Sequence, residues 1–400
     1  MPIVSLSQLL GQSETSSFLR GVVAGGRYAN AYLFHGPAGV GKGTAALAFA
    51  RALLCERTPG AAAVAPGLFD AAPPAGAAPA DDACGVCPAC HKTAALQHPD
   101  LKFLFPVSGE EKQLDATIAE TLTAMREDPY YVFNYEKAAS IRLSLTRELI
   151  RELAYKPFEA SRRAVVVRDA DRMREDQYSA MLKSIEEPGA ATVWVLTTAR
   201  PTRLPATIRS RCQRVRFAPL SEKQVEGVLT GGLGLALREA RMLAALAAGS
   251  LARALTLRDA EPIALRDEAL ALLAPALRGD AAGLWKAAQG LTRFGRAGRE
   301  SLRRVIEFHH LWLRDLLRAR YDAPREMLVH RDRESEIRRQ AAGLDASEIR
   351  RRLMVLEEML RAIEGNVTAD LALYSGAARV AGEHLGEGRW PAHTAARWDY

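Results

Sequence analysis

Short apolar runs alternate with helical periodicity along the first half of the chain. The clearest runs begin at Ala31, Ala164 and Thr192, and each continues for four or five residues without a charge. Unbroken runs of this length predict strands buried on both faces, as in a parallel sheet covered by helices. Between the runs, apolar residues recur three and four positions apart, as at 181–185. The pattern predicts an α/β fold built on a parallel sheet.

Two shorter runs, at 103–106 and 215–217, predict further strands of the same sheet. From Leu220 the pattern becomes helical, and its clearest helix is Ser347–Glu364, with apolar positions spaced four and three apart. The change of period divides the chain into a sheet-bearing domain, a small helical segment, a larger helical domain and a polar tail. Their predicted ranges are 1–218, 219–262, 263–385 and 386–400.

A glycine-rich turn follows the first apolar run. The segment 36–42 fits the first seven places of the phosphate-binding motif G-x-x-x-x-G-K-[ST], with glycines at Gly36, Gly39 and Gly41 and the lysine at Lys42. Such glycines let backbone N–H groups turn around a triphosphate, and the lysine reaches its outer phosphates. The eighth place is Gly43, so the hydroxyl that binds Mg²⁺ is missing. We expect ATP or ADP binding to be possible here but hydrolysis to be poorly supported; a chance glycine-rich turn is the alternative.

Polar residues also stand at the ends of the two later strands. Asp169 follows the run 164–167, where nucleotide-binding sheets place an aspartate directed toward Mg²⁺. The next residue is Ala170, and Asp171 should face the other way. Thr198 ends the run from Thr192 and could contact a γ-phosphate or simply cap its strand. The sequence therefore predicts a degenerate metal position at Asp169 beside the phosphate loop.

Four of the five cysteines form a metal-ligand pattern. Cys84, Cys87 and Cys90 are spaced by two residues each, and Cys55 precedes them. Four thiolates match a closed, tetrahedral structural zinc site, with His91 as a weaker substitute for Cys55. An iron–sulfur cluster is the alternative, although the nearby fourth cysteine followed by proline is absent. The predicted zinc module lies within 55–90 and carries an Ala/Pro/Gly-rich insertion at 58–80, which reads as a flexible surface segment.

Composition adds little that is specific. The formal net charge of +7 permits contact with nucleic acid, but no basic stripe is interleaved with the aromatic residues that stack bases. The first residues have no basic segment followed by an apolar one, and no apolar run approaches the length of a membrane span. We expect a cytoplasmic protein.

Several of these features occur together in one family. The phosphate loop leads into the C-x-x-C-x-x-C insertion, then into His98-Pro99-Asp100, then into a Glu186-Glu187-Pro188 ending and a Ser210-Arg211-Cys212 triplet. Over nearly its whole length the chain resembles the bacterial DNA polymerase III sliding-clamp-loader family of AAA+ ATPases. The resemblance implies an AAA+ core at 1–218, a helical lid at 219–262 and a helical collar for oligomerisation at 263–385.

The chain departs from the ATP-hydrolysing motor subunits of that family at three places. Gly43 removes the metal-binding hydroxyl, and Ala170 removes the acid that activates water. Ala252 stands where a motor would carry an arginine, after Gly249-Ser250-Leu251. Loss of a general base or a metal ligand costs orders of magnitude in rate. The resemblance therefore implies a non-motor, stator subunit.

The resemblance also supplies a role and partners. Arg211 would be an arginine finger acting in trans on a nucleotide bound by an adjacent motor; an ordinary surface ion pair is the alternative. The implied partners are the motor subunits and the delta subunit in a hetero-pentamer, the sliding clamp, and primed DNA through the assembly, with no membrane. Two other functions stay open: an active motor ATPase of the same loader, and a zinc-dependent nucleic-acid-binding module.

Overall fold

The computed structural model describes residues 4–59, 81–107, 113–128, 131–133, 139–186, 192–258, 262–277, 296–364 and 369–381. The insertion predicted at 58–80 falls almost wholly outside these ranges, as does the tail predicted at 386–400. The chain divides into two compact units: Met1–Val225 with Ala248–Thr256, and Glu226–Ala247 with Leu257–Tyr400. The finer division into core, lid and collar stays a prediction.

A five-stranded parallel sheet forms the centre of the first unit, with the strand order β2-β3-β4-β1-β5. Its strands are β1 (Ala31–His35), β2 (Leu101–Leu104), β3 (Arg163–Val167), β4 (Thr192–Thr198) and β5 (Gln213–Arg216). All residues of β3 and β4 are buried, as expected for strands covered on both faces. The α/β class and the parallel sheet are therefore confirmed.

The predicted range of β2 differs from the observed strand by two residues. The strand was expected at 103–106 but begins at Leu101 and ends at Leu104. Its pairing with β3 runs from the bond that Ala164 N–H donates to Asp100 O to the bond that Arg168 N–H donates to Leu104 O. Since β3 ends at Val167, the residues after Leu104 have no strand beside them to extend the ladder.

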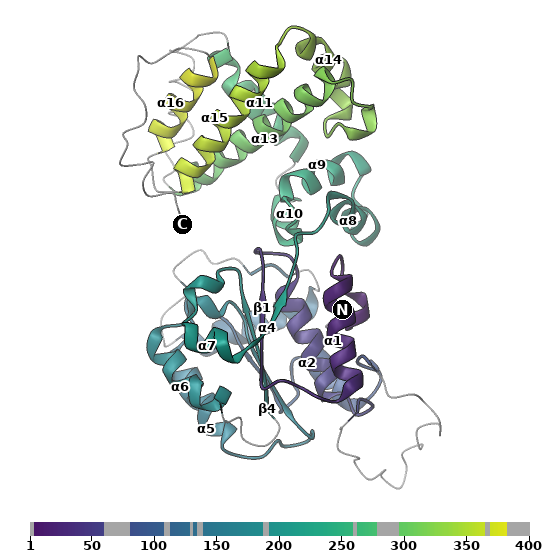
Figure 1. The fold of residues 1–400 in the computed structure, drawn as a ribbon, viewed down its shortest axis with the longest axis vertical. Helices are drawn as coiled ribbons and strands as arrows, with labels where there is room; N and C mark the ends of the chain where they lie inside the picture. The colour runs from purple at the N-terminus through teal and green to yellow at the C-terminus, as the bar shows by residue number, and fades with distance from the viewer. Residues whose placement is uncertain are drawn as a thin grey trace. The chain divides into compact units, whose positions relative to one another are not determined.

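Helices cover both faces of this sheet (Figure 1). On one face lie α1 (Ser13–Gly25) and α2 (Lys42–Leu54), and on the other lie α5 (Leu143–Leu153), α6 (Glu175–Glu186) and α7 (Ala206–Arg211). Alternate strand residues point to opposite faces: Phe34 and Val166 enter the core beside α1 and α2, and Leu33 and Val167 enter the core beside α5 to α7. The unit is thus a three-layer α/β/α sandwich.

Two further helices of this unit lie outside that pattern. The short helix α3 (Pro88–Ala94) begins within the cysteine-rich segment. The helix α4 (Leu114–Glu127) was not predicted, and among its residues only Leu114 is buried. Its other apolar residues, such as Ile118 and Leu122, are partly buried against Phe103 and Phe105. Leu114, Ile118 and Leu122 recur every four positions, so the sequence carries a helical apolar stripe here that the prediction did not include.

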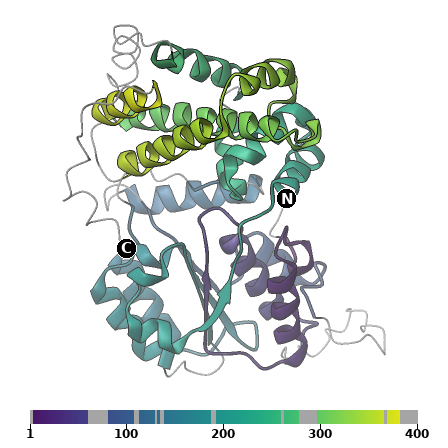
Figure 2. The same cartoon turned by 45° about the horizontal axis from the view of Figure 1, so that its top comes forward.

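The second unit is helical. Figures 1 and 2 agree that α13 (Arg296–Arg320), α15 (Ala346–Glu364) and α16 (Ala369–Ala381) run alongside one another. The start of the helix predicted at 347–364 is confirmed within one residue. The other described α-helices of this unit are α9 (Leu237–Ala247), α11 (Pro262–Leu277) and α14 (Glu334–Ala342). The chain passes between the two units within α8 (Glu222–Gly227), between α9 and α10 (Leu251–Arg258), and again within α10.

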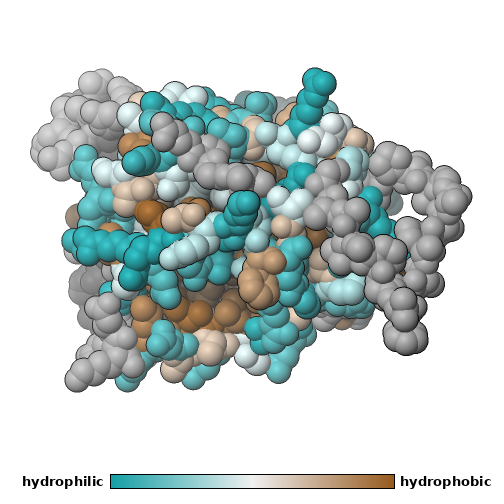
Figure 3. All heavy atoms as spheres, turned by 90° about the horizontal axis from the view of Figure 1, so that it is seen from below, coloured by the Kyte–Doolittle hydropathy of each residue, from teal (hydrophilic) through white to brown (hydrophobic). Residues whose placement is uncertain are grey.

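In the view of Figure 3, hydrophobic side chains gather at the lower centre and hydrophilic ones lie beside them. Among the described helices, none is long and apolar enough to cross a membrane.

Candidate functional site

The predicted phosphate loop connects β1 to α2. Gly36, Gly39 and Gly41 have φ angles of 150°, 74° and 94°, a region that favours glycine. The helix α2 begins at Lys42, and its first intrahelical bond runs from Ala45 N–H to Gly41 O. The N–H groups of residues 42–44 therefore have no partner inside the helix and point from its positive end. This is the backbone arrangement that binds phosphate groups.

Two of these glycines also give room to neighbouring chain segments. A Cβ at Gly36 would lie 2.2 Å from Phe217 O, and a Cβ at Gly39 would lie 2.0 Å from Ser250 Oγ. The N–H of Ala252 donates to Gly39 O at 3.4 Å. The segment that carries Ala252, where a motor would have an arginine, thus packs directly on the loop.

Lys42 is folded onto the loop itself. Its side chain is only 6% exposed, and Nζ donates to Gly36 O at 2.8 Å and to Pro37 O. Burial lowers the pKa of Lys42 to about 8, although the Asp169 carboxylate opposes this shift. The ammonium is therefore a strongly desolvated cation, and an anion beside it would raise its pKa.

Arg168 lies in the space that Gly43 leaves open. An ideal Cβ at Gly43 would stand 2.4 Å from Arg168 Nη1. The guanidinium also lies 3.9 Å from the centre of the Phe133 ring and 3.5 Å from the Asp169 carboxylate. Sequence reasoning missed Arg168, because 125 residues separate it from Gly43 and a single sequence gives no sign of their contact.

The acids beyond β3 are held within the protein. Asp169 has a left-handed backbone (φ 47°), its N–H donates to Thr197 Oγ1 at 3.1 Å, and its carboxylate pairs with Arg168. Thr198 is fully buried, and its hydroxyl donates to Asp171 Oδ1 at 2.6 Å. The hydroxyl also accepts a bond from Arg200 N–H. Asp169 thus lies close to the loop, because it pairs with Arg168, which adjoins Gly43. The Thr198 hydroxyl is hydrogen-bonded to Asp171.

The four predicted metal ligands come together. The Sγ atoms of Cys55, Cys84, Cys87 and Cys90 all lie within 4.8 Å of one another. Cys55 follows α2, and Cys87 and Cys90 lie at the start of α3. Cys55 belongs to this cluster and His91 lies outside it.

The cluster has the dimensions of a tetrahedral thiolate site. The Sγ atoms of Cys84 and Cys90 are 3.9 Å apart, and those of Cys55 and Cys87 are 4.0 Å apart. Tetrahedral zinc with Zn–S bonds of about 2.3 Å requires S–S separations of about 3.8 Å. Hydrogen bonds among these thiols lower the pKa of Cys87 and raise the pKa of Cys55 and of Cys90. The residues present therefore fit a structural metal ion.

Arg211 is the last residue of α7. Its Nε lies 2.6 Å from Glu186 Oε1, its Nη1 donates to Thr207 O at 3.0 Å, and its side chain is 40% exposed. Two residues later, Gln213 pairs with Tyr32 at the amino end of β1, whereas the phosphate loop begins beyond the carboxyl end of that strand. Arg211 and the chain's own loop therefore lie at opposite edges of the sheet.

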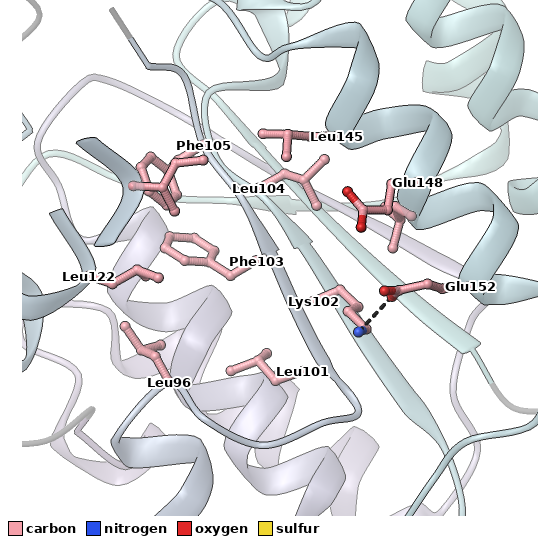
Figure 4. Close-up of a pocket in the computed structure, with 12 residues that line it drawn as sticks. Leu96, Leu101, Lys102, Phe103, Leu104, Phe105, Leu122, Leu145, Glu148 and Glu152 are labelled. Atoms are coloured by element: carbon pink, nitrogen blue, oxygen red, sulfur yellow. Dashed lines mark ion pairs between the residues drawn. The ribbon is translucent and has the colours of Figure 1, made fainter. Parts of the chain in front are cut away.

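A separate cavity of about 270 Å³ runs along β2. Leu101 and Phe103 face Leu96 and Leu122 on one side of it, and the opposite side carries the ion pair between Lys102 and Glu152 (Figure 4). None of the predicted site residues lines this cavity, and we assign it no role.

Comparison with known proteins gives a consistent result. A family model described as DNA polymerase III, delta subunit, matches residues 11–221, more than half of the chain. The DNA polymerase III subunit delta' of Pseudomonas aeruginosa is 33% identical over 191 residues, which are 47% of this chain and 43% of that protein. The corresponding subunit of Bacillus subtilis is 28% identical over 200 residues, which are 50% of this chain and 45% of that protein.

The matches thus span less than half the length of these two relatives. Among solved structures, a DNA polymerase III gamma subunit-related protein of Thermotoga maritima aligns over 73% of this chain and 97% of its own. Its sequence is 18% identical to this chain, and its TM-score is 0.33. On the family match and the two relatives, the chain belongs to the DNA polymerase III delta-prime subunit family.

Proposed function

We propose that this chain is the stator, delta-prime subunit of a DNA polymerase III clamp loader, acting in DNA replication. It would donate Arg211 as an arginine finger in trans to a neighbouring ATPase subunit and help to load the sliding clamp on primed DNA. Its partners would be the motor subunits and the delta subunit. The observation that carries this proposal is the position of Arg211, at the edge of the sheet opposite to the chain's own phosphate loop.

The sheet register supports a role in trans. Gln213 is aligned with Tyr32, and Gly36 opens the loop four residues further along β1. At about 3.3 Å per residue, these four steps separate the two by about 13 Å along the sheet. Arg211 precedes Gln213 and is turned toward Glu186. A guanidinium at this edge is better placed for a phosphate on another subunit than for one on its own loop.

The chain's own loop gives further support for a non-motor role. Position 43 has no hydroxyl, and Arg168 occupies the adjoining space. Ala170, at the place of the water-activating acid, is fully buried and has no group that could accept a proton. We infer that the chain itself does not turn over ATP at an appreciable rate.

The other parts of the chain would serve assembly. We propose that the metal held by the four cysteines is zinc and that it is structural, since a closed set of four thiolates has no open position for a substrate. Residues 1–218 would form the AAA+ core, 219–262 the lid and 263–385 the collar that holds the subunits together.

The test is ATP hydrolysis by the matching motor subunit in a reconstituted loader with clamp and primed DNA. With Arg211→Ala in this chain we expect the rate to fall by at least tenfold. An arginine finger that acts alone on one site raises kcat by about 10³–10⁵-fold. Arg203→Ala, which removes an exposed arginine eight residues earlier in the chain, is the matched control and should leave the rate unchanged. The chain alone gives the baseline and should show no turnover.

Two outcomes would overturn this assignment. Hydrolysis by the isolated chain would make it a motor subunit. An unchanged motor rate with Arg211→Ala, in a loader that still assembles, would withdraw the finger and leave a scaffold role.

A further inference from the structure

The Arg168 guanidinium lies beside the two residues, at positions 43 and 169, that would bind a divalent metal ion at the phosphate loop. Gly43 replaces the residue whose hydroxyl would bind Mg²⁺, and Arg168 Nη1 lies 2.4 Å from where a Cβ at Gly43 would be. Asp169, the acid at the strand end, directs its carboxylate to Arg168 Nε at 3.5 Å. A side chain at position 43 would require the Arg168 guanidinium to move from this place. The residues present therefore do not fit Mg²⁺.

Arg168 is held in this place from three sides. Its backbone N–H donates to Leu104 O at 2.8 Å, which fixes the end of β3 against β2. Its guanidinium stacks on Phe133 at 3.9 Å, a cation–π contact, and Asp169 supplies the opposite charge. The side chain remains 25% exposed, so part of its charge is accessible to a ligand.

A second cation lies next to it. The ammonium of Lys42, which is the residue just before Gly43, is bonded to the carbonyl groups of Gly36 and Pro37. The N–H groups at the start of α2 add the positive end of a helix. Two side-chain cations and these donors would attract a diphosphate, a task that Mg²⁺ otherwise shares with the lysine, and Asp169 and Asp171 offset part of their charge. A divalent cation brought beside Arg168 would instead be repelled by it.

We propose that this loop binds the diphosphate group of a nucleoside diphosphate without a divalent metal ion, with the Arg168 guanidinium in the role of the metal. Gly43 is then a specificity-determining residue, because its missing side chain admits the guanidinium. The nucleotide would be a resident structural ligand of this chain. The inference does not depend on Arg211 or on any partner subunit, so it can fail while the proposed function stands.

The experiment is a calorimetric titration of the purified full-length chain with ADP, once with excess Mg²⁺ and once with EDTA. We expect equal or tighter binding in EDTA, since Mg²⁺ competes with Arg168 for the same phosphates. Arg168→Ala should weaken ADP binding in EDTA by about tenfold or more, as expected for loss of a charge-assisted contact. Arg174→Ala removes an exposed arginine six residues away and should leave ADP affinity unchanged.

A double variant tests the same idea in the opposite direction. Gly43→Ser with Arg168→Ala restores a hydroxyl and the space for it, and its ADP binding should become dependent on Mg²⁺. Thermal unfolding of each variant without nucleotide checks that the fold is intact. The proposal is overturned if the wild-type chain binds no ADP, if its binding requires Mg²⁺, or if Arg168→Ala binds as tightly as the wild type.

Discussion

Asp100 illustrates how much a single buried residue can organise. Its side chain is fully buried, and its two oxygens accept N–H bonds from Phe158, Glu159 and Ala160 at 2.6 to 2.8 Å. Its own N–H donates to His98 Nδ1 at 3.1 Å. A buried carboxylate is tolerated only when it is fully hydrogen-bonded, and here it fixes the loop between α5 and β3. The His98-Pro99-Asp100 segment, which the sequence offered only as a family marker, thus has a physical role in the sheet edge.

His309 is a buried titratable residue whose charged form is disfavoured by burial. Its side chain is 7% exposed, and Nε2 donates to Ala269 O at 3.0 Å. Burial lowers the pKa of His309 to about 4, below the value of about 6.5 expected in the unfolded chain. Below pH 6.5 the unfolded chain therefore binds a proton that the folded chain does not.

We expect this difference to reduce the free energy of unfolding as the pH falls. The contribution is complete above pH 6.5 and is lost down to about pH 4, and at pH 5 the loss should be about 2 kcal/mol. Urea unfolding at pH 7 and pH 5 measures it. In His309→Gln, which keeps an N–H donor for Ala269 O, the pH dependence should be smaller by this amount. His310→Gln, a neighbour that is 31% exposed and paired with Glu357, serves as the control. Equal pH dependence in wild type and His309→Gln would contradict the assignment.

At the scale of elements, the cysteine cluster joins the end of α2 to the start of α3. Cys55 is fully buried, and its Sγ accepts N–H bonds from Cys84 at 3.4 Å and from Arg57 at 3.5 Å. The cluster forms a small apolar group of its own, apart from the two cores of the sheet. Loss of the metal should therefore loosen the cysteine-rich segment without unfolding the sandwich.

Metal removal tests this separation. We expect one zinc ion per chain in the purified protein, and a strong chelator should speed amide hydrogen exchange in residues 84–94 while α2 stays protected. Cys84→Ser should lose the metal. Cys212→Ser, which changes the one cysteine outside the cluster, should retain it. Bound iron, or no bound metal in the wild type, would refute the zinc assignment.

The sequence predicted these elements unevenly, for physical reasons. The strands β3 and β4 were recovered because burial on both faces leaves an unbroken apolar run. The cysteine site was recovered because ligand chemistry is carried by residue identity and short spacing. The helix α4 was missed although its apolar residues Leu114, Ile118 and Leu122 recur at helical spacing. The sequence placed Asp169 beside the phosphate loop, but the direction of the Arg168 side chain toward Gly43 depends on its contacts with Phe133 and Asp169, which a sequence does not show.

At the scale of the whole molecule, the net charge of +7 is a small excess of 54 basic over 47 acidic side chains. Many basic side chains in both units are paired with carboxylates. In the described part of the helical unit the paired arginines include Arg238, Arg241, Arg266, Arg303, Arg318, Arg325, Arg333, Arg338, Arg351, Arg352, Arg361 and Arg379. In the first unit Arg20, Lys92, Lys102 and Arg211 are paired in the same way. Such pairing breaks the positive field into short-range dipoles, which salt screens further.

We therefore expect the isolated chain to bind primed DNA only weakly. Fluorescence anisotropy with a labelled primer–template should give a dissociation constant in the non-specific range of about 10⁻⁴–10⁻⁶ M at physiological salt. Cys84→Ser should not change it, because the cysteine cluster would organise the fold and not a DNA-binding surface. Nanomolar binding that weakens steeply with salt and disappears in Cys84→Ser would point instead to a zinc-dependent nucleic-acid-binding module. A subunit that contacts DNA only within an assembly should bind weakly by itself, and the cysteine variant should not change this binding. The other subunits would then supply most of the phosphate contacts.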